Sequence, residues 1–159
     1  MRVHLIAVGR RVPEWVAAGF DEYARRLPRE CALNLIEVEP GHRAKGVCAS
    51  RARFDEGQRI LRAIPKGART VALDVSGEHW STETLADHLR SWMAGGRDTA
   101  WLIGGPDGLA QDCLQRAEQR WALSRLTFPH PLVRVLVAEQ LYRAWTLVQG
   151  HPYHRAGGD

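Results

Sequence analysis

The chain has 159 residues, of which 45% are hydrophobic, and a formal net charge of +4. This hydrophobic content suffices for a buried core and excludes a fully disordered chain, and the length predicts one domain over residues 1–159. No apolar run approaches the roughly 20 residues of a membrane-spanning helix, and the apolar start at residues 3–8 is too short for a signal peptide. No membrane partner is therefore expected.

In chain order, apolar runs alternate with segments of helical periodicity. Most of the apolar runs are nearly continuous in valine, isoleucine, leucine and alanine, which is typical of strands covered on both faces. The alternation predicts an α/β fold, a mostly parallel sheet with helices on both faces. The expected strands are residues 3–8, 33–38, 70–75, 99–103 and 121–126, and the expected helices are residues 13–27, 50–63, 81–95, 111–119 and 131–149.

The ends of several helices are marked by specific residues. Pro13 suits a first helical turn, and Pro28 prevents the first helix from continuing. Ser81 is a good N-cap for the third helix, which the pair Gly95-Gly96 ends. Residues 40–49 show no periodicity and form an expected basic loop.

Positive charge is concentrated in the second quarter of the chain. Residues 41–70 hold eight basic and two acidic residues, a net charge of +6, which exceeds the net charge of the whole chain. Nearly all the basic residues are arginine, whose planar guanidinium suits phosphate oxygens. A solvated helix face explains any single arginine equally well, so the charge agrees with an RNA partner without establishing one.

The three cysteines, Cys31, Cys48 and Cys113, are odd in number and lack C-x-x-C spacing. This pattern predicts a reducing compartment, taken to be the cytoplasm, and no structural zinc. His151 and His154 lack convincing ligand partners, so no metal is expected.

The last expected helix is apolar on more than one face, which requires burial on several sides. A second subunit would supply one of these sides, so we expect a homodimer; the alternative is a central core helix of a monomer. Within this helix Arg143 follows Glu139 by four residues, the spacing of an intrahelical ion pair. An arginine on so apolar a helix is also a candidate for an interface or substrate role.

Two segments stand where expected strands end, which is where parallel sheets bind ligands. Residues 104–108 read Gly-Gly-Pro-Asp-Gly, and paired glycines permit a sharp turn or the close approach of a ligand. The spacing is not that of the G-x-G-x-x-G dinucleotide fingerprint. Two prolines around His130 restrict the backbone after the last strand and would fix Ser124 and Thr127 in place.

The tail, His151-Pro152-Tyr153-His154-Arg155, combines two imidazoles, a phenol and a guanidinium. Polar tails are commonly disordered, but aromatic and cationic groups are also those that stack on an RNA base.

These segments, in this order, resemble the small pseudouridine N3-methyltransferases of large-subunit ribosomal RNA in the α/β-knot (SPOUT) superfamily. The resemblance covers essentially the whole chain and is most specific in the run Pro-His-Pro-Leu-Val-Arg from Pro129 and in the His-Pro-Tyr-His tail. It is weakest at residues 41–53. It implies a C-terminal trefoil knot, a homodimer, the methyl donor S-adenosylmethionine, and ribosomal RNA of the large subunit or assembled ribosome as partner.

The resemblance also assigns roles to residues. Donor contacts carried over from the family fall on Leu73, Gly104, Leu123, Ser124, Arg125, Leu126, Thr127 and Phe128. We further assign Arg143 and His154 to removal of the N3 proton or stabilisation of the resulting anion, and Tyr153 to positioning of the base.

Three other readings fit parts of the pattern. A flavodoxin-like module would hold a nucleotide or flavin without catalysis and would retain a coloured cofactor. A structural ribosome-associated dimer would bind no methyl donor, which calorimetry with S-adenosylmethionine would reveal. A methyltransferase acting on another RNA base, such as a tRNA uridine, is the nearest competitor.

Overall fold

The computed structural model describes residues 1–154, except for the side chain of His154. Its five strands form one parallel sheet in the order β2-β1-β4-β3-β5. The strands are β1 (Arg2–Val8), β2 (Ala32–Val38), β3 (Arg69–His79), β4 (Thr99–Ile103) and β5 (Gln119–Ala122). The α-helices are α1 (Glu14–Ala24), α2 (Ala49–Ala63), α3 (Thr82–Gly95), α4 (Gln111–Arg116) and α5 (His130–Gln149), and two short 3₁₀ helices are η1 (Arg29–Cys31) and η2 (Pro152–His154).

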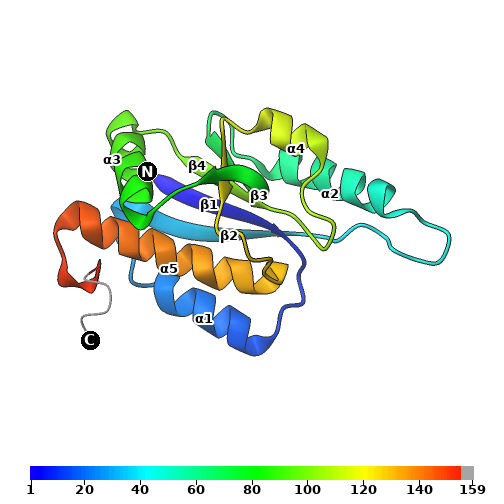
Figure 1. Ribbon diagram of the computed structural model, residues 1–159, viewed down its shortest axis with the longest axis horizontal. Coiled ribbons are helices and arrows are strands. Elements are labelled where there is room, and N and C mark those ends of the chain that lie inside the picture. Colours follow the sequence, from blue (N-terminus) through cyan, green and yellow to red (C-terminus); the bar gives the residue numbers. More distant parts are fainter. Residues whose placement is uncertain (155–159) are drawn as a thin grey trace.

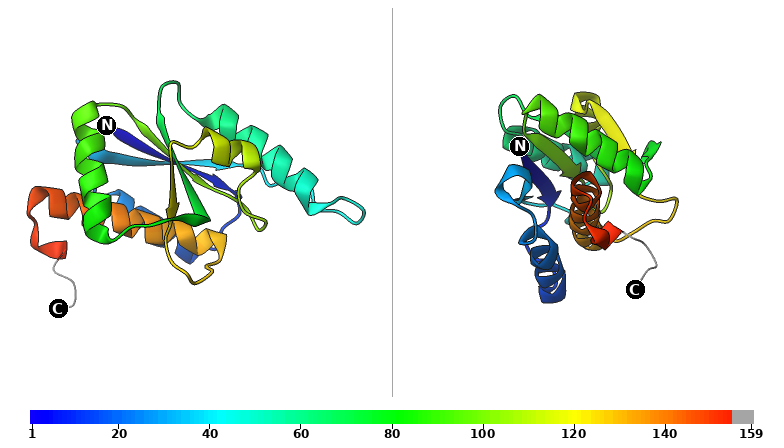
Figure 2. Two further views of the ribbon diagram at one scale, coloured as in Figure 1. Left: turned by 45° about the horizontal axis from the view of Figure 1, so that its top comes forward. Right: turned by 90° about the vertical axis from the view of Figure 1, so that its left-hand side faces the viewer.

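The helices cover both faces of the sheet, as the alternation of elements predicts (Figures 1 and 2). One hydrophobic core joins the sheet to α1, α3 and α5 and includes the fully buried Trp101 and Leu141. A second core joins the other face to α2 and α4 and includes Ile60 and Cys113. Within the described residues, no helix is long and apolar enough to span a membrane.

The expected strand and helix positions are largely confirmed, and Ser81 caps α3 by accepting a hydrogen bond from the backbone N–H of Thr84. Some expected bounds are wrong. The last strand was expected at residues 121–126, but β5 ends at Ala122. Leu126 is 70% exposed, so its apolar character does not come from a buried strand. The helix expected at residues 111–119 ends at Arg116, because Gln119 already pairs with Val71 of β3, and the helix expected at residues 13–27 ends at Ala24.

The sheet has a break in pairing where β3 meets β5. Leu73 and Glu78 both pair with Trp121, so residues 74–77 leave the ladder as a bulge. Gly77 lies against the backbone of Arg120, where a Cβ atom would come within 2.7 Å, so only glycine fits there. The bulge places Asp74 and Val75 just beyond Ala72, the last residue of β3 that pairs with β4.

Across the four neighbouring strands β2, β1, β4 and β3, the connection that follows each strand leaves the sheet on alternating faces. The chain goes to the α1–α5 face after β1 and β3, but to the α2–α4 face after β2 and β4. Adjacent parallel strands whose connections diverge leave a crevice at their carboxyl ends, which is the usual ligand position in open α/β sheets. Such crevices therefore lie on both sides of β4, towards β3 and towards β1.

Candidate active site

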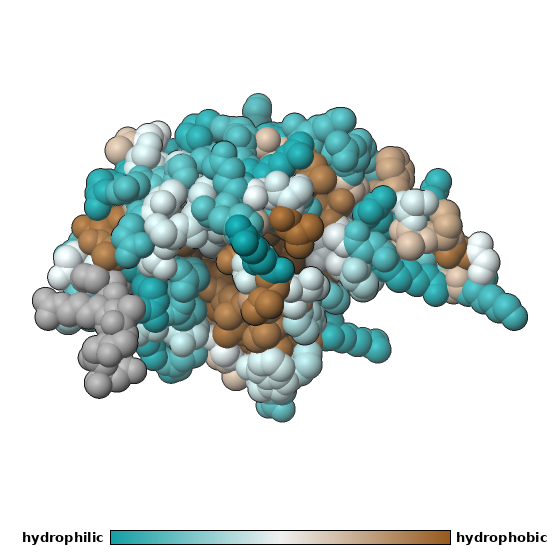
Figure 3. All heavy atoms as spheres, in the orientation of Figure 1, coloured by the Kyte–Doolittle hydropathy of each residue, from teal (hydrophilic) through white to brown (hydrophobic). Residues whose placement is uncertain are grey.

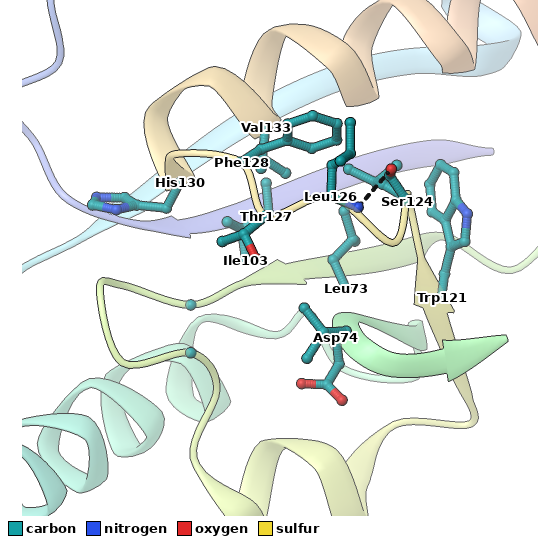
Figure 4. A pocket seen from close by; sticks show the side chains of 14 residues that line it. Leu73, Asp74, Ile103, Trp121, Ser124, Leu126, Thr127, Phe128, His130 and Val133 are labelled. Atoms are coloured by element: carbon teal, nitrogen blue, oxygen red, sulfur yellow. Dashed lines mark hydrogen bonds between the residues drawn. The ribbon is translucent and has the colours of Figure 1, made fainter. Parts of the chain in front are cut away.

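A pocket lies where the pairing of β3 with β4 ends, at the carboxyl end of β4 and beside the chain that connects β5 to α5 (Figure 4). Its volume is about 140 Å³, and it is partly open to solvent. The lining is mostly apolar. Its residues are Leu73, Asp74, Val75, Ile103, Gly104, Gly108, Trp121, Leu123, Ser124, Leu126, Thr127, Phe128, His130 and Val133.

The glycine-rich segment after β4 forms one wall as a tight turn. The backbone N–H of Gly108 donates to the carbonyl of Gly105 at 3.0 Å, and Gly108 has φ +78°. A Cβ atom on Gly104 would lie 2.4 Å from the backbone carbon of Gly108. The turn expected from the sequence is therefore present, and the same turn also borders the pocket.

The segment between β5 and α5 forms the opposite wall. Its peptide groups from 124 to 128 take part in a single hydrogen bond within the described chain, from the backbone N–H of Leu126 to Oγ of Ser124 at 3.0 Å. The remaining amides and carbonyls of this segment are available to a ligand. Apolar side chains beside free peptide groups suit a flat heteroaromatic ring, which needs stacking surface and hydrogen-bond partners at its edge.

Seven of the eight residues assigned to donor contact line this one pocket, although they come from three separate segments. Arg125 is the exception, because its side chain is exposed and does not belong to the lining. Contact of any of the eight with a methyl donor stays a prediction.

Sequence reasoning did not single out several lining residues. Asp74 and Val75 stand at the end of an expected strand. Because parallel sheets bind ligands where strands end, the sequence alone could have identified both as candidate site residues. The Asp74 carboxylate accepts hydrogen bonds from the backbone N–H and hydroxyl of Ser76 and is the only carboxylate among the residues that line the pocket. Trp121 and Val133 were expected only as strand and helix residues.

Two of the three residues assigned to catalysis lie together at the C-terminal end of α5. Arg143 is held by Glu139, with its Nη2 2.6 Å from Oε1, which confirms the intrahelical ion pair. Its guanidinium carbon lies 5.0 Å from the centre of the Tyr153 ring, and the Tyr153 hydroxyl donates to the same Glu139 oxygen at 3.3 Å. The third residue, His154, has its side chain outside the described part of the structure.

The environment of Tyr153 decides what its hydroxyl does at neutral pH. Burial, followed by the negative charge of Glu139, raises the pKa of Tyr153 to about 12. The hydrogen bond to Glu139 raises the pKa of Arg143 above its ordinary value. Tyr153 therefore remains a phenol that donates a hydrogen bond, and Arg143 remains a cation; neither acts as a general base at neutral pH.

The pocket is lined by His130 and Val133 at the start of α5, whereas Arg143 lies near the end of this helix and Tyr153 follows it. His130 borders the pocket, and Arg143 follows it by 13 helical positions, a separation of roughly 20 Å along the helix axis at 1.5 Å per residue. Within one chain, these groups do not act on the same reacting atom.

A doubly covered parallel sheet with a pocket at diverging strand ends defines an open α/β protein, the class in which ligands bind at this position. The family model described as predicted SPOUT methyltransferase matches residues 1–154. The chain therefore belongs to the SPOUT methyltransferase family. A putative methylase family protein from Neisseria gonorrhoeae shares the fold, with a TM-score of 0.54 and 10% identity over 88% of this chain and 81% of that chain.

Curated relatives are similar over their full length. The protein named ribosomal RNA large subunit methyltransferase H from Methylococcus capsulatus is 59% identical over 155 residues, which cover 98% of this chain and 100% of the relative. The protein of the same name from Alkalilimnicola ehrlichii is 58% identical over 156 residues, with the same coverage.

Proposed function

We propose that this chain is a cytoplasmic enzyme that transfers a methyl group from S-adenosylmethionine to N3 of a pseudouridine in large-subunit (23S) ribosomal RNA. Membership of the SPOUT methyltransferase family and the name of the curated relatives support the reaction class and the RNA. The observation that carries the proposal is the pocket, where seven of the eight residues assigned to the donor converge from distant parts of the chain. We further propose one catalytic domain over residues 1–159 with a C-terminal trefoil knot.

The chemistry of the pocket fits this donor. Leu73, Ile103 and Phe128 offer apolar surface to an adenine ring, and the free peptide groups at 124–128 offer donors and acceptors to its edge. Asp74 places a carboxylate at a pocket that would receive a sulfonium cation. Residues 73–74, 104 and 123–128 would hold the donor, which supplies an already activated methyl group.

Methyl transfer requires N3 of the acceptor base to lose its proton and to face the methyl carbon in line with the sulfur. A carbon–nitrogen bond then forms as the carbon–sulfur bond breaks, and the electron pair of that bond stays on the sulfur. Arg143, as a fixed cation, stabilises the negative charge that develops on the base, and Tyr153 positions the base by stacking or as a hydrogen-bond donor. His154 or water takes the proton.

The roughly 20 Å between the pocket and the Arg143–Tyr153 cluster leads us to a homodimer in which each active site combines the pocket of one protomer with the cluster of its partner. The pocket mouth carries two exposed apolar side chains, Val75 at 77% and Leu126 at 70% exposure. Figure 3 shows hydrophobic residues gathered over the N-terminal half of α5, beside this mouth. An apolar surface next to an incomplete site favours a second copy of the chain as its occupant.

The direct test is incubation with labelled S-adenosylmethionine and ribosomes that lack the modification, followed by mapping of the labelled nucleoside. Label on N3 of a large-subunit pseudouridine is expected. Label on a tRNA uridine or on another base would replace the proposal with the neighbouring reaction, and the absence of donor binding in calorimetry would end it.

The assignment of residues is tested separately. Arg143→Ala and His154→Ala should each reduce turnover while leaving the affinity for the donor nearly intact, and full activity in both variants would contradict their roles. The composite site is tested by mixing Arg143→Ala with Gly104→Ala at a donor concentration where each variant alone has low activity. About a quarter of the wild-type activity should return, since half of the randomly mixed two-fold dimers carry one intact site. No recovery in dimers shown to exchange subunits would refute the composite site.

A further inference from the structure

A second and larger cavity lies next to the pocket, at the carboxyl end of β1. Residues at or after the ends of β1, β2 and β4 form it, together with the start of α5, and we refer to it as the β1 groove. Its volume is about 810 Å³, against about 140 Å³ for the pocket. It is lined by Val8, Gly9, Arg10, Arg11, Glu39, Pro40, Gly41, Arg43, Pro106 and His130.

The position of the groove is that of a ligand site. It covers β1, whose connection goes to one face of the sheet, whereas those of its neighbours β2 and β4 go to the other. Crevices of this kind hold ligands in open α/β sheets, and the pocket occupies the corresponding position between β3 and β4. Its volume of about 810 Å³ lies in the upper part of the range of about 300–1,000 Å³ that is usual for ligand sites, so the groove has room for a segment of a larger ligand.

The charges around the groove identify the kind of ligand. Arg43 is held between Glu56 and Asp107, so its charge is compensated. Arg10 is paired with Glu39 at 3.2 Å, but both side chains are more than half exposed, so the pair is weak and leaves Arg10 able to contact a phosphate. Arg11 is exposed and has no carboxylate partner in the described structure.

Two further arginines donate only to backbone carbonyls around the groove: Arg53 to that of Asp107, and Arg59 to those of Glu39 and Pro40. Their positive charge is not neutralised by a carboxylate among the described residues. The backbone N–H groups of Arg10 and Arg11 also donate no hydrogen bond within the described chain. Uncompensated guanidinium groups beside free amides attract phosphate.

The β1 groove and the pocket share a wall. His130 borders both, and the tight turn after β4 contributes Gly104 and Gly108 to the pocket but Pro106 to the groove. Figure 4 shows the His130 ring directed away from Ser124 and Leu126, the opposite wall of the pocket. A chain lying in the groove therefore leads to the place where the methyl group is transferred.

From these observations, and resting on the proposed function, we infer that the β1 groove binds the sugar-phosphate backbone of the RNA strand next to the target nucleotide, through Arg10 and Arg11. The protomer that holds the methyl donor then also holds the flanking phosphates, while the partner supplies Arg143 and Tyr153. Contacts to phosphate position the strand and carry no sequence information, so recognition of the base is left to the pocket and the partner's cluster.

The test compares Arg11→Ala and Arg10→Ala/Arg11→Ala with Arg116→Ala. Arg116 is exposed on α4, has no carboxylate partner in the described structure, and does not line the groove, so it controls for the loss of one charge. Affinity is measured for large-subunit particles lacking the modification, for the naked ribosomal RNA and for an oligonucleotide of unrelated sequence, each over a range of salt concentrations.

We expect Arg11→Ala to weaken binding to all three by a similar factor and to reduce the slope of log affinity against log salt by about 0.7–0.9, the contribution of one phosphate contact. The double variant should lower the slope by about twice that amount, while the affinity for S-adenosylmethionine stays unchanged. Arg116→Ala should match the wild type.

Wild-type affinity and slope in the double variant would overturn the inference, even if the wild type methylates its target. A loss confined to intact particles, absent with naked RNA, would also overturn it, because the groove would then contact ribosomal protein. If the wild type bound RNA through the groove but transferred no methyl group, the proposed function would fail and the groove would stand.

Discussion

Arg134 is a buried cation behind the wall that the pocket and the β1 groove share, and its removal tests how the end of β1 is held. Its side chain is 1% exposed. Nη1 lies 2.7 Å from Oε2 of Glu37, and Nη2 donates to the carbonyls of Gly9 at 2.6 Å and Val8 at 3.3 Å. We expect Arg134→Met, which keeps most of the volume, to leave these three acceptors without their donor.

Breaking a buried ion pair by removing one partner costs about 3–5 kcal/mol. Glu37 is 31% exposed, so water can solvate its freed carboxylate, and we expect the lower end, about 3 kcal/mol. With a slope of about 2 kcal/mol per molar urea for a chain of this size, the unfolding midpoint should fall by about 1.5 M.

The matched control is Arg90→Met, which breaks the exposed pair between Arg90 and Asp87 on α3. Exposed pairs of this kind contribute at most about 0.5 kcal/mol, a midpoint shift of about 0.25 M. Urea unfolding followed by circular dichroism measures both variants under the same conditions. A midpoint for Arg134→Met no lower than that for Arg90→Met would refute the reasoning.

Three further outcomes are expected. Gly104→Ala places a Cβ atom 2.4 Å from the Gly108 backbone, so calorimetry should show at least a tenfold weaker donor affinity; unchanged affinity would contradict the role of the turn. Cys48 should react with iodoacetamide before Cys31 in mass spectrometry, because a hydrogen bond with Ser50 lowers the pKa of the exposed Cys48 thiol whereas burial raises that of Cys31 to about 12.

The third outcome concerns pH. Burial, and then the charge of Arg134, lowers the pKa of His130, so the unfolded chain binds more protons than the folded chain below about pH 6.5. The urea midpoint should therefore fall from pH 7.5 to 5.5, and less steeply in His130→Asn; equal slopes would exclude His130 as the cause.

The sequence predicts the elements well because most of them are set by local patterns. Runs such as residues 100–103 are apolar because β4 is covered on both faces, and Ser81 and Gly96 mark the ends of α3. The same pattern predicts a strand as far as residue 126 and is wrong there, because Leu123 and Leu126 extend the apolar run of β5 but border a pocket instead of a core.

Other features depend on how distant segments meet. The order β2-β1-β4-β3-β5 puts the ends of β1 and β4 side by side, and neither the β1 groove nor its wall follows from the chain order. The bulge at 74–77 depends on the register between β3 and β5. The separation of Arg143 from the pocket, by contrast, follows from the expected length of the last helix and a rise of 1.5 Å per residue.

The wall that the pocket and the β1 groove share, formed by His130 and the turn after β4, has a thermodynamic consequence. If the methyl donor in the pocket or the RNA in the β1 groove shifts the equilibrium position of this wall, thermodynamic linkage requires the affinity for the other ligand to change. The donor then changes the affinity for RNA by the same factor by which RNA changes the affinity for the donor. Arg43 ties Asp107, at the tip of that turn, to the basic segment between β2 and α2. Measuring methyl-donor affinity with and without bound RNA, and RNA affinity with and without donor, thus gives one coupling free energy by two independent routes.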